Sequence, residues 1–340
     1  MGKEKDIKKY DDGFTSEDFE PAERNDEIDM DLPISSEGRL KTALRRYVSN
    51  KGAMFGLVTL LLLILLSVLV PVLSSKGYEE QNAERSYLAP RIQGIMNGSE
   101  KIPYTTGEKV VNKYDELSIN DTDYWFGTDI LGRDLFTRCF KGMQVSLLIA
   151  LAAGAISLII GMNYGMISGY IGGKTDMVMQ QIVDVLSCIP TLVVVTLLML
   201  VFKPGIGSII FAIMLTGWME MSIIARAQVF KLKEREYVLA AKTLGAGNVF
   251  ILFKEILPNI FETLVTELMV SIPNAIFFET FLSFVGLGLP VGSCSLGRLI
   301  SEGFDNCLIH PYTLIPPMIL LVLLMISANL VAEGLKQAFE

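Results

Sequence analysis

Six long apolar stretches constrain the fold of this chain more than any other feature. The first runs for 24 residues without a charged side chain, and the second for 32. A helix of about 20 apolar residues crosses the hydrocarbon core of a bilayer. The sequence therefore predicts an all-α membrane protein with six transmembrane helices, at residues 52–75, 142–173, 177–202, 205–225, 256–289 and 312–332.

Acidic side chains lie inside three of these stretches, at Asp184, Glu220, Glu262, Glu267 and Glu279. A charge at the middle of a membrane costs about 2.5–3.5 kcal/mol on the insertion scale, so such a residue is a candidate for function. Pairing within the protein and a place on a substrate path or proton relay both fit these acids. Glu267, Asn274 and Glu279 are the candidates for a translocation path.

The charge of the chain is concentrated at its beginning. Residues 1–38 hold 13 acidic and 5 basic side chains, which accounts for the whole net charge of −8. This acidic segment has few apolar residues and is expected to be a disordered, solvated tail. The rest of the chain is neutral and lacks the basic stripe of a nucleic-acid-binding protein, so no nucleic-acid partner is expected.

Basic residues in short loops predict the orientation of the spans. One group precedes the first span and another lies between the fourth and fifth: Arg39, Lys41, Arg45, Arg46 and Lys51, then Arg226, Lys231, Lys233, Arg235, Lys242 and Lys254. Cytoplasmic loops carry such an excess of Lys and Arg, which places both termini in the cytoplasm. The predicted segments are a tail at 1–38, a basic segment with the first span at 39–75, an extracytoplasmic segment at 76–141 and a transmembrane domain at 142–340.

Gly, Pro and Asn residues punctuate the extracytoplasmic segment between the first two spans. They predict a small irregular insert of turns and short strands. Cys294 and Cys307 share a later outer loop, and free thiols are expected there rather than a disulfide, whose geometry is strict. His310, in the same loop, is expected to be an ordinary loop residue near the membrane interface.

The sequence carries little that points to an enzyme or a metal site. His310 is the only histidine, and the four cysteines show no Cys-x-x-Cys spacing, so neither a metal nor a cofactor is expected in this chain. The stretch 172–175 resembles the end of a phosphate-binding loop but lacks its first glycine, and a tight turn is expected instead. ATP hydrolysis would then belong to another subunit.

Gly161, Gly165 and Gly169 recur every four residues in the second span. Small residues at this spacing form a flat stripe on which another helix packs closely. The pattern predicts a tight helix–helix contact.

The cytoplasmic segment 226–258 is the most informative loop. Tyr237, Val238, Ala241 and Leu244 recur at helical spacing and form one apolar stripe. Gly245 and Gly247 then break the helix, and Leu257-Pro258 marks the return to the membrane. The apolar side chains of this stripe must be buried against something, which could be the membrane surface, the chain's own helices or a soluble partner.

This loop resembles the one that defines permease subunits of binding-protein-dependent ABC importers. It reads Leu239-Ala240-Ala241-x3-Gly245-x9-Glu255-Ile256-Leu257-Pro258. Residues 126–134, 169–173 and 282–288 are similar to further motifs of the C-type subunit of oligopeptide and dipeptide permeases. The chain is identified on these motifs as a member of that family.

The resemblance implies a multi-pass permease of the cell membrane that imports oligopeptides or dipeptides by alternating access. The implied partners are a second homologous permease subunit, two ATP-binding cassette ATPase subunits, an extracytoplasmic peptide-binding protein and membrane lipid. The residues implied to couple to the ATPase are Tyr237, Val238, Ala240, Ala241, Leu244, Gly245 and Pro258.

A second class of protein stays open at this stage. The intramembrane acids also suit an ion- or proton-coupled secondary transporter. Such transporters are often built from internal repeats, which are not evident in this sequence. That class would also leave the stripe at 237–247 without a role.

Overall fold

A computed structural model describes residues 39–104, 107–119, 122–203, 205–290 and 292–339. The chain divides into two units, Met1–Thr42 and Ala43–Glu340, and the second contains all the packing described below. The predicted disordered tail at 1–38 lies outside the described residues. The first described element, α1, covers Arg39–Ser49.

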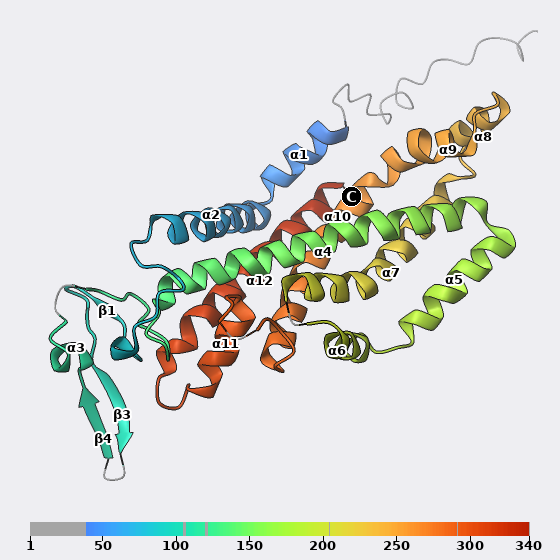
Figure 1. Ribbon diagram of the computed structural model, residues 1–340. Helices are drawn as coiled ribbons and strands as arrows, with labels where there is room; N and C mark the ends of the chain where they lie inside the picture. Colours follow the sequence, from blue (N-terminus) through green and yellow to red (C-terminus); the bar gives the residue numbers. More distant parts are fainter. Residues whose placement is uncertain (1–38, 105–106, 120–121, 204, 291, 340) are drawn as a thin grey trace, which may run out of the picture. The chain divides into compact units, whose positions relative to one another are not determined.

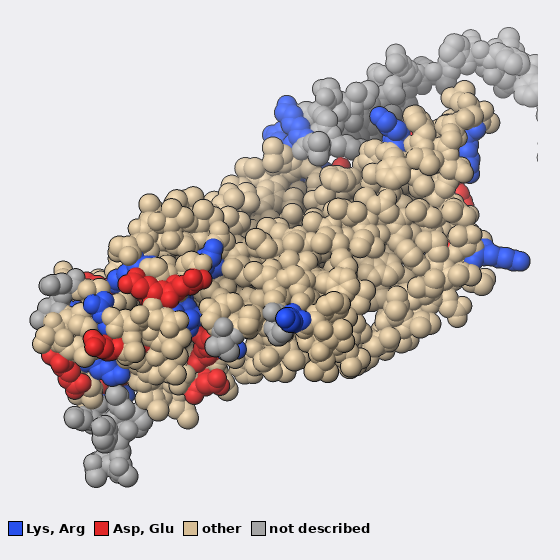
Figure 2. Space-filling view, in the orientation of Figure 1, with Lys and Arg blue, Asp and Glu red and all other residues tan. Residues whose placement is uncertain are grey.

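Five helical segments among the described residues are long and apolar enough to cross a membrane. They correspond to α2 (Lys51–Leu73), α4 (Leu135–Ile171), α7 (Ile206–Leu232), α10 (Leu257–Phe284) and α12 (Ile315–Phe339) (Figure 1). Figure 2 shows charged side chains gathered over the segment before α4 and few over the middle of the bundle. The prediction of an all-α membrane protein is confirmed.

The third predicted span is not one straight helix. It consists of α5 (Gly173–Ser187) and α6 (Thr191–Val201), which meet at an angle of 77°. Pro190 lies in the break, and a proline disfavours helical backbone at the residue before it and donates no hydrogen bond. The predicted count of six spans is reached only if this bent pair counts as one.

The longest helix, α4, packs along α7 through the predicted glycine stripe. A Cβ atom on Gly165 would lie 2.2 Å from the carbonyl oxygen of Ser222, and one on Gly161 would lie 2.4 Å from that of Trp218. Backbone atoms of a neighbouring helix cannot move away from such a contact. The predicted tight helix–helix contact is therefore confirmed, and α7 is the partner.

A single methyl group on this stripe is expected to destabilise the fold. Gly165→Ala should lower the free energy of unfolding by about 1–3 kcal/mol, because the new Cβ forces α4 and α7 apart. Gly207→Ala is the matched control, since a Cβ there meets nothing within 4 Å. Thermal unfolding of the solubilised variants measures both effects; equal unfolding temperatures would contradict the argument.

Helix α10 packs against three of the other long helices. It contacts α4, α7 and α12, and α12 also packs on α2. The shorter α11 (Leu296–Asp305) covers one end of α10, and the turn η5 (Pro311–Thr313) leads into α12. The largest buried apolar cluster gathers side chains from α4, α7, α10, α11 and α12.

The segment between α2 and α4 forms a small cap. It contains η3 (Ala83–Arg85), the short pair β1 (Arg91–Ile92) and β2 (Met96–Asn97), the hairpin β3 (Glu100–Tyr104) and β4 (Gly107–Val111), and α3 (Lys113–Glu116). The predicted turns and short strands are thus present. Helix α4 begins at Leu135, seven residues before the predicted span at 142–173, because Asp134 caps it by accepting a hydrogen bond of 2.9 Å from the Thr137 amide. The side of the membrane on which the cap lies stays a prediction.

Candidate functional site

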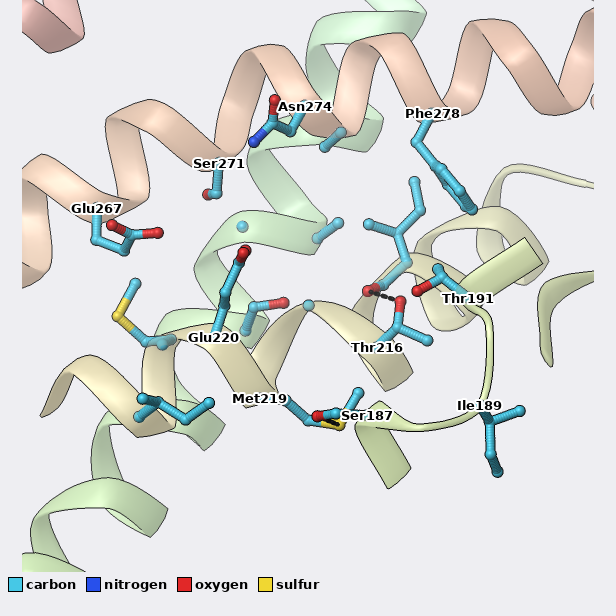
Figure 3. Close-up of a pocket in the computed structure, with 18 residues that line it drawn as sticks. Ser187, Ile189, Thr191, Thr216, Met219, Glu220, Glu267, Ser271, Asn274 and Phe278 are labelled. Atoms are coloured by element: carbon cyan, nitrogen blue, oxygen red, sulfur yellow. Dashed lines mark hydrogen bonds between the residues drawn. The ribbon is translucent and has the colours of Figure 1, made fainter. Parts of the chain in front are cut away.

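A cavity of about 400 Å³ opens between α4, α7 and α10, beside the break between α5 and α6. Figure 3 shows Glu267, Ser271 and Asn274 on the α10 wall, facing Thr216, Met219 and Glu220 on α7. Ser187 and Thr191 come from the two sides of the α5–α6 break. Both arms of the bent third span therefore contribute a hydroxyl group to the cavity lining.

The lining of the cavity is mostly apolar, with acidic and hydrogen-bonding side chains set into it. Its described lining includes two carboxylates, Glu220 and Glu267, and no lysine or arginine. Hydroxyl and amide groups supply the other polar contacts, at Ser157, Ser187, Thr191, Thr216, Ser271 and Asn274. This arrangement favours a cationic or hydrogen-bonding solute over an anionic one.

The structure separates the three predicted path residues. Glu267 and Asn274 line the cavity, whereas Glu279 lies outside its lining and is fully buried. The carboxylate of Glu279 accepts hydrogen bonds from Ser146 Oγ at 2.9 Å and Ser283 Oγ at 3.0 Å. Glu279 therefore joins α4 to α10, which is the structural pairing that the sequence left open.

Sequence reasoning missed most of the cavity wall, although a signal was present. Glu267, Ser271, Asn274 and Phe278 follow one another at spacings of four, three and four, which places them on one helix face. Of these four residues, Glu267 and Asn274 were predicted, whereas Ser271 and Phe278 were not. The hydroxyl groups on the facing helices could not be assigned to the cavity without the packing.

The other predicted acids and the thiols occupy ordinary positions. Asp184 is exposed on α5 and accepts a hydrogen bond of 3.0 Å from Gln180, and Glu262 is half-buried on α10. Cys294 and Cys307 are both free. No cluster of three or more His, Cys, Asp or Glu side chains among the described residues is placed to hold a metal ion.

His310 lies in the loop between α11 and η5, as predicted, but it is not an exposed loop residue. It is buried, with Nδ1 3.0 Å from the Glu100 carboxylate and its ring stacked on Tyr87 at 4.1 Å between centroids. The cap and the loop before α12 meet at this residue. Sequence reasoning could not see this contact because Glu100 lies 210 residues away.

The loop after α7 folds as helix, glycine turn and helix. It contains α8 (Glu236–Thr243), α9 (Asn248–Phe250) and the π-helical turn η4 (Ile251–Ile256) that leads into α10. Gly245 has φ of +83°, a conformation that residues with a Cβ rarely adopt, so it sets the turn. Pro258 lies in the first turn of α10, where no hydrogen bond from its nitrogen is needed.

The predicted apolar stripe on this loop divides between two faces. Val238 is fully buried and packs with Ile251 and Ile256, and Ala241 and Ala246 pack against the same cluster. Tyr237 is 39% exposed and Leu244 is 88% exposed. The chain's own helices therefore cover the inner half of the stripe, and Ala240 lies on the exposed side.

Exposed apolar side chains remain on the outer face of the loop. We define the loop patch as Leu239, Leu244, Val249, Phe250 and Phe253, whose side chains are 45–88% exposed. An exposed apolar patch bordered by charged residues often marks an interaction site. Because Val238 anchors α8 to the base of α10, the patch is fixed to the bundle rather than tethered loosely.

An ion pair ties the same end of the bundle together. The Arg226 guanidinium binds the Asp176 carboxylate through two hydrogen bonds of 2.5 and 2.7 Å, and Ser168 Oγ donates to Asp176 at 2.6 Å. Lys233 Nζ also donates to the Gly169 carbonyl at 3.1 Å. Helices α4, α5 and α7 thus hold a common geometry next to the loop.

Comparison with protein families gives two matches along the chain. Residues 161–340 match the family described as the binding-protein-dependent transport system inner membrane component. Residues 38–90 match the N-terminal transmembrane domain of oligopeptide transport permease C.

Individual relatives cover nearly all of the chain. The oligopeptide transport system permease protein OppC of Bacillus subtilis (strain 168) is 37% identical, over 95% of this chain and 96% of that protein. The dipeptide transport system permease protein DppC of Lactococcus lactis subsp. cremoris (strain MG1363) is 39% identical, over 88% of this chain and 89% of that protein. A chain of the methionine ABC transporter MetNI in inward-facing conformations is 17% identical with a TM-score of 0.48, over 60% of this chain and 96% of that chain.

Proposed function

The chain belongs to the oligopeptide and dipeptide permeases among the inner membrane components of binding-protein-dependent transport systems, and on this basis we propose that it forms half of the pathway of an ATP-driven peptide importer. The observation that carries the proposal is the match to relatives named for oligopeptide and dipeptide transport along nearly the whole chain. Two structural features are consistent with this proposal: the loop patch would contact an ATPase subunit, and the acidic cavity would form part of the path for the peptide.

The loop patch is the proposed contact with an ATPase subunit. Its apolar residues would lie in a groove of that partner, and Gly245 sets the angle between the two short helices. Val238, Ile251 and Ile256 join the loop to α10 in one buried cluster. A displacement of the ATPase would therefore move α10 as a rigid lever.

The cavity is the proposed stretch of the translocation path. It lies against α10, so rocking of this helix would change the opening of the cavity. A second homologous permease subunit would close its open side, and an extracytoplasmic binding protein would deliver the peptide. Two ATPase subunits would supply the energy, since no nucleotide-binding motif is evident in this sequence.

Peptide uptake with two energy sources tests the proposal. Cells that lack this gene should lose uptake of labelled di- or tripeptides and regain it with the wild-type gene. Depletion of ATP should abolish that uptake, whereas an uncoupler that collapses the proton gradient while ATP is maintained should not. Uptake that follows the proton gradient alone would instead support the secondary transporter.

Neutralising the cavity is expected to change which peptides are carried. Glu220→Gln combined with Glu267→Gln should lower uptake of peptides with a free amino terminus about tenfold, because about 1.4 kcal/mol of attraction for the ammonium group is lost. Uptake of N-acetylated peptides should change little. Asp184→Asn is the matched control, since this acid is exposed and does not line the cavity. An equal loss for both peptide forms would contradict the expectation.

A further inference from the structure

The basic helix before the first span, α1, has no role in the function proposed above. Its inner face is held by the chain itself, because Ala43 and Tyr47 are buried in one cluster with Ala53 of α2 and Ala338 of α12. The Tyr47 hydroxyl also donates to the Ala53 carbonyl at 3.4 Å. Residues 43–49 are therefore fixed against the ends of two helices that are long and apolar enough to cross a membrane.

The rest of the apolar surface of α1 is exposed. We define the α1 strip as Leu44 and Val48, whose side chains are 64% and 55% exposed. Each of them follows a buried residue by one position, so the strip lies about 100° around the helix from the inner face. The described residues therefore cover only one side of this apolar surface, and the other side needs a partner outside the chain.

Basic side chains border the α1 strip. We define the α1 cations as Arg45, Arg46 and Lys51, which are exposed and make no ion pair with a described residue. The helix ends that meet here, residues 43–54 and 333–339, carry four basic side chains and one acidic side chain. This end of the bundle therefore combines exposed apolar side chains with an excess of positive charge.

The position of α1 identifies the partner that meets both requirements. Because α1 directly precedes a membrane-crossing helix, it lies where the headgroups of a bilayer meet the hydrocarbon core. A bilayer with anionic lipids offers an apolar boundary and negative charge at this depth, which is what a basic amphipathic helix binds. A free phosphate ion would neutralise the cations but would leave the α1 strip in water. The acidic residues 1–38 are the other source of negative charge, and the test separates them from lipid.

We propose that the outer face of α1 binds anionic phospholipids, with the α1 strip at the acyl boundary and the α1 cations on the phosphate groups. Because Tyr47 joins α1 to α2 and its cluster reaches α12, lipid bound here would hold the ends of these two helices together. The proposal stands on α1 alone and does not depend on what the permease carries.

Hydrogen–deuterium exchange of residues 43–49 measures this binding in the full complex. The complex is reconstituted into nanodiscs of phosphatidylcholine, with or without phosphatidylglycerol. Phosphatidylglycerol should slow the exchange about tenfold, since each cation next to an anionic surface adds to the attraction. High salt should remove most of this difference, because it screens the charges.

Two kinds of variant assign the effect to the outer face of α1. Arg45→Gln combined with Lys51→Gln should remove most of the difference between the two bilayers, and both side chains are exposed, so the fold should persist. Lys174→Gln combined with Lys231→Gln is the matched control, because it removes two exposed charges from α5 and α7 and should leave the difference intact. Leu44→Gln should speed the exchange in both bilayers, since the α1 strip contacts lipid of any charge.

Three outcomes would overturn the proposal. Equal exchange of the wild type in the two bilayers would mean that α1 does not recognise anionic lipid. If that equal exchange is slow and high salt speeds it in both bilayers, the acidic residues 1–38 cover the face instead. A full difference that persists in the variant Arg45→Gln with Lys51→Gln would mean that the lipid acts elsewhere on the complex.

Discussion

Leu244→Asp combined with Val249→Asp is expected to abolish co-purification of the ATPase subunits with this chain. Both side chains belong to the loop patch and are 88% and 71% exposed, so the substitutions leave the fold intact. In the proposed groove they would bury two unpaired carboxylates, and each costs several kcal/mol. Since every 1.4 kcal/mol is a factor of ten in affinity, binding should weaken by at least about 100-fold.

The control for this experiment is an aspartate of equal exposure at a distant site. Leu308 is 90% exposed in the loop between α11 and η5, so Leu308→Asp has the same chemistry away from the loop patch. ATPase subunits should co-purify with the control as with the wild type. If they also co-purify in full with the double variant, the loop patch is not the contact. Substitutions at Val238 or Ala241 test this less clearly, because both residues pack inside the chain.

Arg226→Leu is expected to destabilise the chain by about 2–3 kcal/mol. The substitution leaves the Asp176 carboxylate, whose side chain is 11% exposed, without its bidentate partner. Removing one partner of a buried ion pair costs about 3–5 kcal/mol, and the lower value here follows from Arg226 being 29% exposed. The unfolding midpoint of the solubilised protein measures the loss.

The double variant Asp176→Leu with Arg226→Leu separates the pair from its surroundings. Replacing both charges by apolar side chains removes the unpaired carboxylate, so most of the lost stability should return. An equally low midpoint for single and double variants would mean that Arg226 acts through other contacts. In the double variant Ser168 loses Asp176 as its hydrogen-bond acceptor, so the recovered stability should stay below that of the wild type.

Much of the fold was predictable because membrane insertion depends on local sequence. The long apolar runs gave the spans, and the spacing of Gly161, Gly165 and Gly169 gave a close helix contact, which the structure assigns to α7. The break at Pro190 escaped prediction because the apolar run continues through it. Hydropathy measures transfer into lipid and is insensitive to the direction of the helix axis.

The candidate sites were predictable only in part. The stripe at 237–244 was visible as a helical period, yet the period could not tell which residues the chain itself covers. Val238 faces inward and Leu244 outward because η4 and α10 lie on one side of α8 only. The sequence does not distinguish the roles of the acids in α10. Packing buries Glu279 in contact with α4, whereas Glu267 lines the cavity.

The amino-acid sequence alone shows that this chain spans the membrane, which family it belongs to and where its loop helix lies. These properties depend on runs, periods and motifs within short stretches of chain. The walls of the cavity, the burial of His310 against Glu100 and the inward position of Val238 follow only from the packing. Each of these joins residues far apart in the sequence, and their proximity depends on how the helices pack, which no local pattern specifies.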